Sequence, residues 1–244
     1  MTDHSRGAPG QPGGRVAADF DRVAASYDLL VGLNPGYRRH LRRSAERLEL
    51  AGEARILDLC CGTGQSTLAL RAVYPQATLC GLDAAAEMLQ VARARPQLAG
   101  VEFVHGDAMD PAAAGIDGPF DGILMAYGIR NVPDADACLR RVRELLAPGA
   151  PVCFHEYSVT GSPFHTAVWK AVTALIIIPA ARVVTGDDGL FRYLRDSVLA
   201  FDSVDGFKRR LRHAGFADVR TLPAGGWQRG IVHSFLARRP EDDR

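Results

Sequence analysis

Residues 56–67 read Ile56-Leu57-Asp58-Leu59-Cys60-Cys61-Gly62-Thr63-Gly64-Gln65-Ser66-Thr67. An apolar run comes first, a Gly-x-Gly turn follows, and a helical pattern starts directly after it, which predicts a strand, a tight loop and a helix. Gly62 and Gly64 let the backbone approach a ligand closely because no Cβ stands in the way. In a doubly wound sheet this first loop is where nucleotides bind. The stretch therefore predicts a nucleotide-type site at the end of the first strand.

The same alternation continues along the chain. Short apolar runs predict strands at 56–60, 77–82, 101–104, 122–127 and 152–157, and helical patterns separate them near 66–73, 84–94 and 135–146. Residues 163–200 and 203–215 then predict helices, and 217–222 and 231–237 predict a closing hairpin. Continuous apolar strands between helices imply a parallel sheet covered on both faces. We expect an α/β fold with a doubly wound, mostly parallel seven-stranded sheet, N-terminal helices and a helical insertion before the last strands.

The charge balance and the cysteines limit the classes of function. Lys plus Arg total 29 and Asp plus Glu total 28, a net charge of +1, which argues against broad electrostatic binding of nucleic acid or anionic lipid. The five cysteines include no C-x-x-C pair, so a reduced, cytoplasmic protein without a metal site is expected. The longest apolar run, 171–184, is shorter than a membrane span and carries Pro179 and Arg182. We therefore expect no membrane span, while peripheral contact with a membrane stays open.

Acidic residues end three successive predicted strands. Asp58 lies under the glycine loop, Asp83 ends the second strand and Asp107 follows the third. The third glycine of a dinucleotide fingerprint is missing, since Thr67 stands there, and a carboxylate at position 58 would repel a pyrophosphate. A carboxylate suits a cofactor with an ammonium and a sulfonium, Asp83 suits its ribose hydroxyls, and Asp107 suits an adenine amine. This favours S-adenosylmethionine over NAD; the alternative is that the three acids only cap the helices that follow.

Longer motifs carry a family resemblance. They are Asp58–Gly64, the loop Tyr127-Gly128-Ile129-Arg130-Asn131-Val132, Leu145–Gly149, His155-Glu156-Tyr157-Ser158 and Phe191–Val198. With these motifs, residues 17–238 resemble the ubiquinone/menaquinone biosynthesis C-methyltransferases, within the class I S-adenosylmethionine-dependent methyltransferases of Rossmann-like fold. The Gly-Ile-Arg-Asn loop is the most specific of the motifs. The resemblance implies methyl transfer from S-adenosylmethionine to a ring carbon of a prenylated hydroquinone, with S-adenosylhomocysteine as the second product.

The expected site residues form three groups, and no metal ligand is expected. The cofactor would be bound by Asp58, Cys60, Gly62, Gly64, Asp83, Ala84, Met88, Asp107, Ala108 and Met125. The acceptor would be bound by Tyr127, Asn131, Glu156 and Tyr193. Of the catalytic group, Arg130 is a permanent cation suited to stabilising a phenolate, and Tyr27 would help to close the site. His155 titrates near neutrality and suits removal of the ring proton; the alternative is that it is a core residue of its strand.

The chain departs from the family pattern near the expected acceptor site. His155 stands where the family has leucine, and an extended turn with Trp227 precedes the last strand. These departures favour an alternative, a methyltransferase of specialised metabolism acting on carbon or oxygen of another aromatic or prenylated small molecule. The apolar segment Trp169–Val184 predicts a wall for a prenyl tail, a subunit interface of a homo-oligomer, or both.

The domain organisation follows from these patterns. Residues 1–15 hold four Gly and two Pro and predict a disordered leader, and residues 16–240 predict a single methyltransferase domain. Within this domain we expect a helical cap over 16–52, the cofactor-binding core over 54–158, a helical acceptor or interface segment over 159–215, and the hairpin over 216–238.

Overall fold

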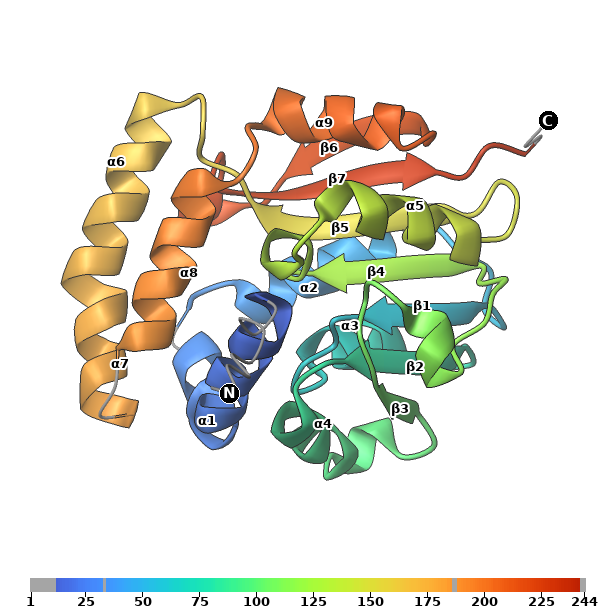
Figure 1. Cartoon of the computed structure of the whole chain (residues 1–244), viewed down its shortest axis with the longest axis horizontal. Helices are drawn as coiled ribbons and strands as arrows, with labels where there is room; N and C mark the ends of the chain where they lie inside the picture. The colour runs from blue at the N-terminus through green and yellow to red at the C-terminus, as the bar shows by residue number, and fades with distance from the viewer. Residues whose placement is uncertain (1–11, 33, 186–187, 242–244) are drawn as a thin grey trace, which may run out of the picture.

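The centre of the molecule is a seven-stranded sheet, and the computed structural model describes residues 12–32, 34–185 and 188–241 (Figure 1). The strands are β1 (Arg55–Leu59), β2 (Thr78–Asp83), β3 (Glu102–His105), β4 (Gly122–Ala126), β5 (Pro151–Tyr157), β6 (Ala217–Pro223) and β7 (Val232–Arg238). They lie in the order β3-β2-β1-β4-β5-β7-β6. The neighbours from β3 to β5 are parallel, and β7 is antiparallel to β5 and β6. The predicted doubly wound sheet and its C-terminal hairpin are confirmed.

Helices account for the rest of the regular structure. They are α1 (Pro12–Gly32), α2 (Tyr37–Glu46), α3 (Gln65–Val73), α4 (Ala86–Arg93), α5 (Ala135–Leu145), α6 (Pro163–Val172), α7 (Ile178–Thr185), α8 (Gly189–Ala200) and α9 (Val204–His213). Shorter turns are η1 (Pro96–Leu98), η2 (Pro111–Ala114), η3 (Ile129–Asn131), η4 (Thr173–Ile177, a π-helical turn) and η5 (Gly226–Gln228). The predicted leader lies outside the described residues up to position 11, whereas 12–15 already belong to α1.

Two helical layers cover the sheet because successive strand side chains point to opposite faces. Leu57 and Phe154 lie in the core on the face packed against α5 and α9. Ile56 and Cys153, each one residue away in the same strands, lie in the core on the face packed against α2 and α3. Burial on both sides explains why the central strands are continuous apolar runs rather than alternating ones.

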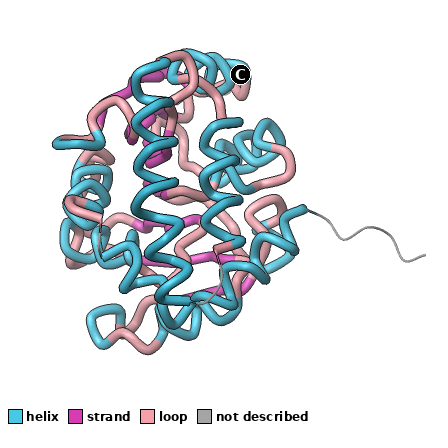
Figure 2. The backbone as a smooth tube through the Cα atoms, turned by 90° about the vertical axis from the view of Figure 1, so that its left-hand side faces the viewer, coloured by secondary structure: helices cyan, strands magenta, loops and turns pink. Residues whose placement is uncertain are grey.

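A further helical layer lies beyond the carboxyl ends of the parallel strands. Figure 1 shows α1, α6, α7 and α8 at this end, and Figure 2 views the same side face-on. Val23 and Ala24 of α1 pack in one apolar cluster with Met88 of α4 and with Ile178 and Phe191 of the outer helices. Ligands of open α/β sheets bind at the carboxyl ends of the strands, so this layer forms a roof over the expected site.

The outer helix of this layer begins at the predicted residue 163, but it is apolar over a longer stretch than the run 171–184 that the sequence pattern indicated. The π-helical turn joins α6 to α7, and residues Pro163–Val184 form 22 continuous helical residues. By length and composition this helix could cross a membrane, and it is the one such helix among the described residues. Only 22% of its most apolar window is buried, with Trp169 and Thr173 facing inward while Leu175 and Val183 are 76% and 87% exposed. It therefore has apolar side chains on both its inner and its outer side.

Candidate active site

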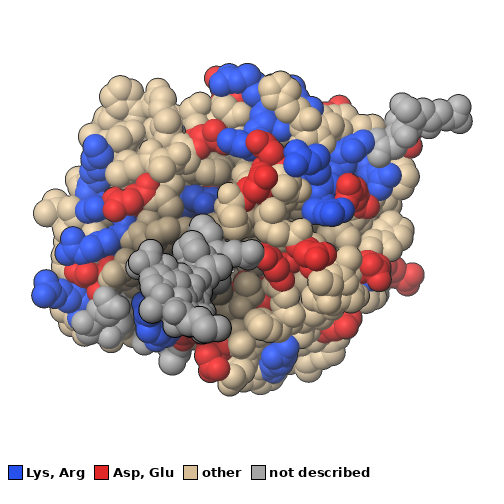
Figure 3. All heavy atoms as spheres, viewed as in Figure 1, with Lys and Arg blue, Asp and Glu red and all other residues tan. Residues whose placement is uncertain are grey.

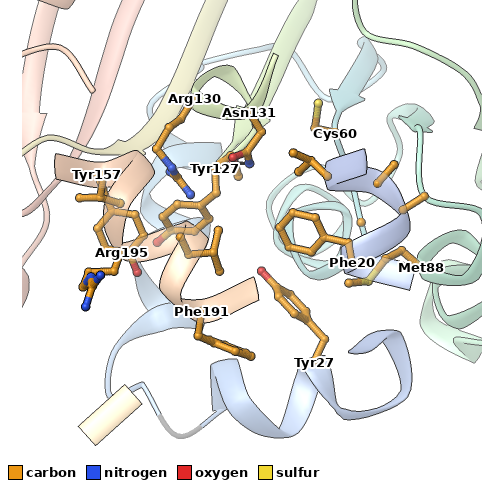
Figure 4. Close-up of a pocket in the computed structure, with 18 of the residues that line it drawn as sticks. Phe20, Tyr27, Cys60, Met88, Tyr127, Arg130, Asn131, Tyr157, Phe191 and Arg195 are labelled. Carbon is orange, nitrogen blue, oxygen red and sulfur yellow. Dashed lines mark hydrogen bonds between the residues drawn. The ribbon is translucent and has the colours of Figure 1, made fainter. Parts of the chain in front are cut away.

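A cavity of about 950 Å³ lies between the strand ends and the helical roof (Figure 4). Eleven of the predicted site residues line it, namely Tyr27, Cys60, Gly62, Asp83, Ala84, Met88, Asp107, Ala108, Tyr127, Arg130 and Asn131. The structure thus brings together residues from the ends of β1, β2 and β4, the segment after β3, and helices α1 and α4. The other six, namely Asp58, Gly64, Met125, His155, Glu156 and Tyr193, lie outside the cavity wall.

The glycine loop and Asp83 form one end of the cavity. The backbone N–H of Gly62 donates to Asp83 Oδ2 at 2.8 Å, and that of Ala85 donates to Oδ1 at 2.8 Å. Gly62 has a φ of +53°, and a Cβ added there would meet no atom within 4 Å, so this position opens onto free space. Burial raises the pKa of Asp83, while these two backbone donors favour its ionised form.

Asp58 lies beneath the loop and holds it to α3. Its Oδ2 accepts from Ser66 Oγ at 2.8 Å and from Thr67 Oγ1 at 2.6 Å, and the residue is fully buried. Asp58 lies outside the cavity wall, and one of its oxygens anchors the first turn of the helix, so direct cofactor contact at Asp58 stays a prediction. Its Oδ1 has no hydrogen-bond partner among the described residues, and burial raises the pKa of this carboxyl to about 7.

Helix α1 is attached to the same loop through Asp28. Its carboxylate accepts from Thr63 Oγ1 at 2.8 Å and from Gln65 Nε2 at 2.9 Å, and it forms an ion pair with Arg95. Arg95 Nε in turn donates to the carbonyl oxygen of Thr63 at 2.7 Å. Because Phe20 of the same helix lines the cavity, these contacts couple the glycine loop to the roof.

Arg130 and Glu156 form a buried ion pair at the opposite end of the cavity. The side chain of Arg130 is 3% exposed and that of Glu156 is fully buried. Arg130 Nε also donates to Ser197 Oγ of α8 at 2.9 Å, and Tyr157 N donates to Glu156 Oε1 at 2.8 Å. Figure 4 shows the guanidinium directed toward Tyr127 and Tyr157. Glu156, predicted to contact the acceptor, is corrected to the residue that orients Arg130.

Aromatic side chains surround the arginine end. The Tyr127 ring stacks on Tyr37 with centroids 5.7 Å apart and lies 4.9 Å from the Tyr157 ring. Burial raises the pKa of Tyr27 to about 12 and that of Tyr127 well above its usual value, so both are protonated hydroxyls at neutral pH. Tyr127 has a φ of +59°, an uncommon conformation for a residue with a side chain, and one concentrated at functional sites.

His155 lies behind Tyr127 and is 1% exposed. Its Nε2 is 3.0 Å from Tyr127 Oη, and its Nδ1 is 2.8 Å from Ser44 Oγ of α2. Burial lowers the pKa of this imidazole to about 3, so the ring is neutral at pH 7. The prediction that His155 removes a proton from the acceptor is corrected, since Tyr127 separates it from the cavity.

Three further predicted residues support the wall from outside. Gly64 has a φ of +80°, a left-handed backbone conformation that glycine adopts without strain. Met125 is fully buried in the sheet core. Tyr193 of α8 donates through its hydroxyl to Asn131 Oδ1 at 3.2 Å and so fixes the Asn131 side chain.

The predicted wall segment contributes Trp169, Thr173 and Ile176 to the cavity, and the turn expected near the acceptor contributes Trp227. Four further cavity residues had not been predicted from the sequence, namely Phe20, Tyr37, Tyr157 and Phe191. Each belongs to a helical or strand pattern that also fits plain core packing, so only the fold brings them to one site. Within the described residues, no group of three or more His, Cys, Asp or Glu side chains is placed to hold a metal ion.

Comparison with known proteins identifies the family. The sequence matches the ubiE/COQ5 methyltransferase family over residues 11–234. The chain belongs to this family. It is 33% identical to the ubiquinone/menaquinone biosynthesis C-methyltransferase UbiE of Syntrophotalea carbinolica, over 94% of this chain and 96% of that protein. It is 34% identical to the demethylmenaquinone methyltransferase of Clavibacter sepedonicus, over 87% of each. The enzyme is therefore an S-adenosylmethionine-dependent methyltransferase.

Solved structures agree with this methyltransferase fold. The [4+2]-cyclase SpnF superimposes with a TM-score of 0.69 at 18% identity, covering 96% of this chain and 98% of that one. Phosphoethanolamine N-methyltransferase 2 of Haemonchus contortus, in complex with S-adenosyl-L-methionine, gives a TM-score of 0.64 at 16% identity over 90% of this chain and 57% of that one. At these identities the likeness concerns the fold alone.

The residues at the glycine-loop end fit S-adenosylmethionine. The carboxylates that line the cavity, Asp21, Asp83 and Asp107, lie toward this end, and the unpartnered Oδ1 of Asp58 is buried beneath it. Carboxylates favour a cationic ligand and disfavour a pyrophosphate. Gly62 leaves open the space that a side chain would fill. Asp83 would hold the ribose hydroxyls, while Met88 and Ala108 supply apolar surface for the adenine ring.

Proposed function

We propose that this enzyme transfers the methyl group to a ring carbon of a prenylated quinol or a related phenol. The observation that carries the proposal is the arginine end of the cavity. There Arg130, Tyr127 and Tyr157 line the cavity beside apolar side chains of the roof helices, among them Trp169, Ile177 and Phe191. The relatives named as menaquinone and ubiquinone methyltransferases support the same acceptor class.

Each group in the cavity has a chemical task in this reaction. The cofactor supplies a methyl group bonded to a sulfonium, a good leaving group. Arg130 stabilises a phenolate oxygen by its fixed positive charge, which increases electron density on the neighbouring ring carbon. With the cofactor bound, that carbon would take the methyl group, S-adenosylhomocysteine would be the leaving product, and the ring proton would pass to a water molecule to restore the aromatic ring. The roof helices hold the ring in line and exclude water.

The test is a labelled methyl transfer to acceptors of graded tail length. S-adenosylmethionine with a deuterated methyl is incubated with demethylated naphthoquinols carrying no tail or one, two or three prenyl units, and the products are analysed by mass spectrometry and NMR. We expect a carbon-linked label and a kcat/KM that rises with tail length, because each buried CH₂ contributes about 0.8 kcal/mol. An absence of labelled quinol, with cofactor binding confirmed by calorimetry in the same sample, would refute the acceptor.

A second candidate is a methyltransferase of specialised metabolism that acts on carbon or oxygen of another aromatic compound. Trp227 favours it, because the indole lines the cavity and is held in place by a 3.3 Å hydrogen bond from Nε1 to the carbonyl oxygen of Pro35. A rigid ring in the wall narrows the set of acceptors. A label found on oxygen, or turnover of tailless phenols at the rate of prenylated ones, would select this candidate.

We further propose that the enzyme is cytoplasmic and contacts a lipid surface through the outer side of α6 and α7. All five cysteines are free, as a reducing compartment allows. Phe164, Leu175 and Val183 are exposed on the outer helix, whose residues 163–184 include two cations, Lys170 and Arg182, and no carboxylate. An apolar face flanked by cations suits an anionic membrane interface. On the face shown in Figure 3, by contrast, acidic and basic side chains are interspersed.

A further inference from the structure

A chain of buried polar groups runs from α2 to the cavity wall. Arg47 Nη1 donates to Ser234 Oγ at 2.6 Å. Ser234 Oγ is 2.6 Å from Ser44 Oγ, which is 2.8 Å from Nδ1 of His155. The chain ends at Nε2 of His155, 3.0 Å from Tyr127 Oη. Ser234 is the register partner of His155 across β5 and β7, so the sheet itself sets this alignment.

The arginine fixes one end of this chain. A guanidinium can only donate, so Ser234 Oγ accepts from Arg47. The two serine hydroxyls can rotate, and in one of the arrangements that remain Ser234 donates to Ser44 Oγ. The Ser44 hydroxyl then donates to Nδ1 of His155. A neutral imidazole carries a single N–H, which must lie on Nε2 when Nδ1 accepts, and it donates to Tyr127 Oη. In this arrangement each hydroxyl proton from Ser234 to Ser44 has an acceptor within the chain.

The burial of His155 maintains this state. Desolvation lowers the pKa of the imidazole, and the nearby charges of His40, Arg47 and His233 lower it further. The ring therefore stays neutral across the physiological pH range, and only one of its two nitrogens carries a proton. An imidazolium would instead donate from both nitrogens and would oppose the Ser44 hydroxyl.

We propose that His155 is a positioning residue that makes the Tyr127 hydroxyl donate its proton into the cavity, toward an oxygen of the acceptor. The Tyr127 ring is already held between Tyr37 and Tyr157, so the direction of its O–H bond is the freedom that remains. When His155 donates to Tyr127 Oη, the hydroxyl hydrogen points away from His155, toward the Tyr157 hydroxyl and the cavity that both tyrosines line. A second donor beside Arg130 would stabilise the acceptor oxyanion. This inference rests on the proposed phenolic acceptor.

The first test measures the tautomer directly and needs no acceptor. Two-dimensional NMR of the full chain with ¹⁵N-labelled histidine distinguishes a protonated from an unprotonated ring nitrogen. We expect His155 to be neutral with the proton on Nε2 from pH 5.5 to 8.5, and Ser44→Ala to populate the other tautomer. A proton on Nδ1 in the parent enzyme would overturn the proposal, because Tyr127 would then donate to His155 rather than into the cavity.

The second test separates positioning from packing. Gln at position 155 can donate an amide N–H to Tyr127 Oη, whereas Leu cannot. We expect His155→Leu to lower kcat/KM for the quinol about 10-fold, His155→Gln to stay within about threefold of the parent, and the Kd for S-adenosylmethionine to be unchanged in both. Equal losses in the Leu and Gln variants would contradict the proposal, since packing alone would then explain them.

A double-mutant cycle completes the test. Tyr127→Phe removes the hydroxyl on which His155 acts, so we expect its loss to equal or exceed that of His155→Leu and the double variant to lose nothing more. Losses that multiply in the double variant would show that the two residues act independently. Tyr127→Phe retains the aromatic ring, and His155→Gln retains the hydrogen bond to Tyr127. These two variants can still be compared with the parent if His155→Leu does not fold. If the parent enzyme methylates no quinol, the proposed acceptor is wrong. The tautomer measurement still tests the direction of the hydrogen bonds from Ser234 to Tyr127, because it needs no acceptor.

Discussion

Arg130 and Glu156 show how strongly single residues are coupled in this site. The two side chains are almost completely buried, so removing one charge leaves the other unpaired in a medium that solvates it poorly. We expect Arg130→Gln to lower the free energy of unfolding by about 3–5 kcal/mol. The double variant Arg130→Gln/Glu156→Gln should recover most of this loss while kcat/KM stays about 100-fold below the parent. Urea unfolding and initial rates measure the two quantities.

Arg195 provides the matched control for this pair. It also lines the cavity, but it is partly exposed and bonded to the surface residue Asp196 at 2.8 Å. Arg195→Gln should therefore change both unfolding and kcat/KM little. Parental turnover in the Arg130/Glu156 double variant would show that the guanidinium charge has no part in the reaction.

At the residue scale, short sequence motifs predicted several of the residues that line the cavity. Asp83 and Arg130 were found because each lies in a motif tied to a strand end, and both line the cavity. Asp58 and His155 were predicted to contact ligands, yet they form hydrogen bonds with α3 or α2 and lie outside the cavity wall. A polar side chain at a strand end forms hydrogen bonds with whichever helix packs beside it. That helix can be distant in sequence, so the motif does not contain the information.

Asp58 links two elements, and its titration should be visible in stability. Its pKa is raised to about 7 in the folded state, above its ordinary value near 3.9, so the folded protein binds the extra proton. The stability of the parent relative to Asp58→Asn should then fall as pH rises from about 4 to 7. We expect a change of about 3 kcal/mol in this difference between pH 4.5 and 8, measured by urea unfolding. A difference independent of pH would contradict the assignment.

The attachment of α1 to the glycine loop gives a second prediction at the element scale. Asp28→Ala removes the acceptor of Thr63 and Gln65 and the ion-pair partner of Arg95. We expect the KM for S-adenosylmethionine to rise about 10-fold, since the cost of losing such hydrogen bonds is about 1–3 kcal/mol. Asp19→Ala is the control, because Asp19 lies on the same helix and pairs only locally with Arg22. Equal KM values for the two variants would exclude a role for this attachment.

Element positions were largely predictable because periodicity and glycine turns are local signals. The five parallel strands and the hairpin agree with their apolar runs within a few residues. The helical segment from residue 163 was also predicted, whereas the π-helical turn η4 within it was not, because residues 173–177 continue the same apolar pattern. The start of α1 also precedes the predicted boundary, because the glycines at 13 and 14 resemble a linker.

At the scale of the whole molecule, the outer side of α6 and α7 determines how the enzyme meets its surroundings. Leu175→Ser/Val183→Ser removes two of its most exposed apolar side chains. We expect the parent to sediment with vesicles of anionic phospholipid and the double variant to do so several-fold less, because the buried apolar area and the nearby cations drive binding. Leu222→Ser, a 39% exposed position on β6, is the control.

Analytical ultracentrifugation decides between this surface and a subunit interface. A parent dimer that becomes monomeric in the double variant, with no vesicle binding by either, would contradict the lipid contact and assign the face to a second copy of the chain. The sequence predicted a helical cap and a helical acceptor segment, but not that α1 packs against α7 and α8 to form one roof, because these helices are distant in the chain and meet only in the folded protein.

The central claim is that one cavity binds a cationic cofactor at its acidic end and a phenolic ring at its arginine end. A crystal structure with S-adenosylhomocysteine and a short-chain demethylated naphthoquinol tests it most directly. We predict the ribose hydroxyls on the Asp83 carboxylate, a quinol oxygen within hydrogen-bond distance of Arg130 or Tyr127, and the prenyl tail along the inner side of α6 and η4. A ribose bound away from Asp83, or a quinol ring outside this cavity, would contradict the account.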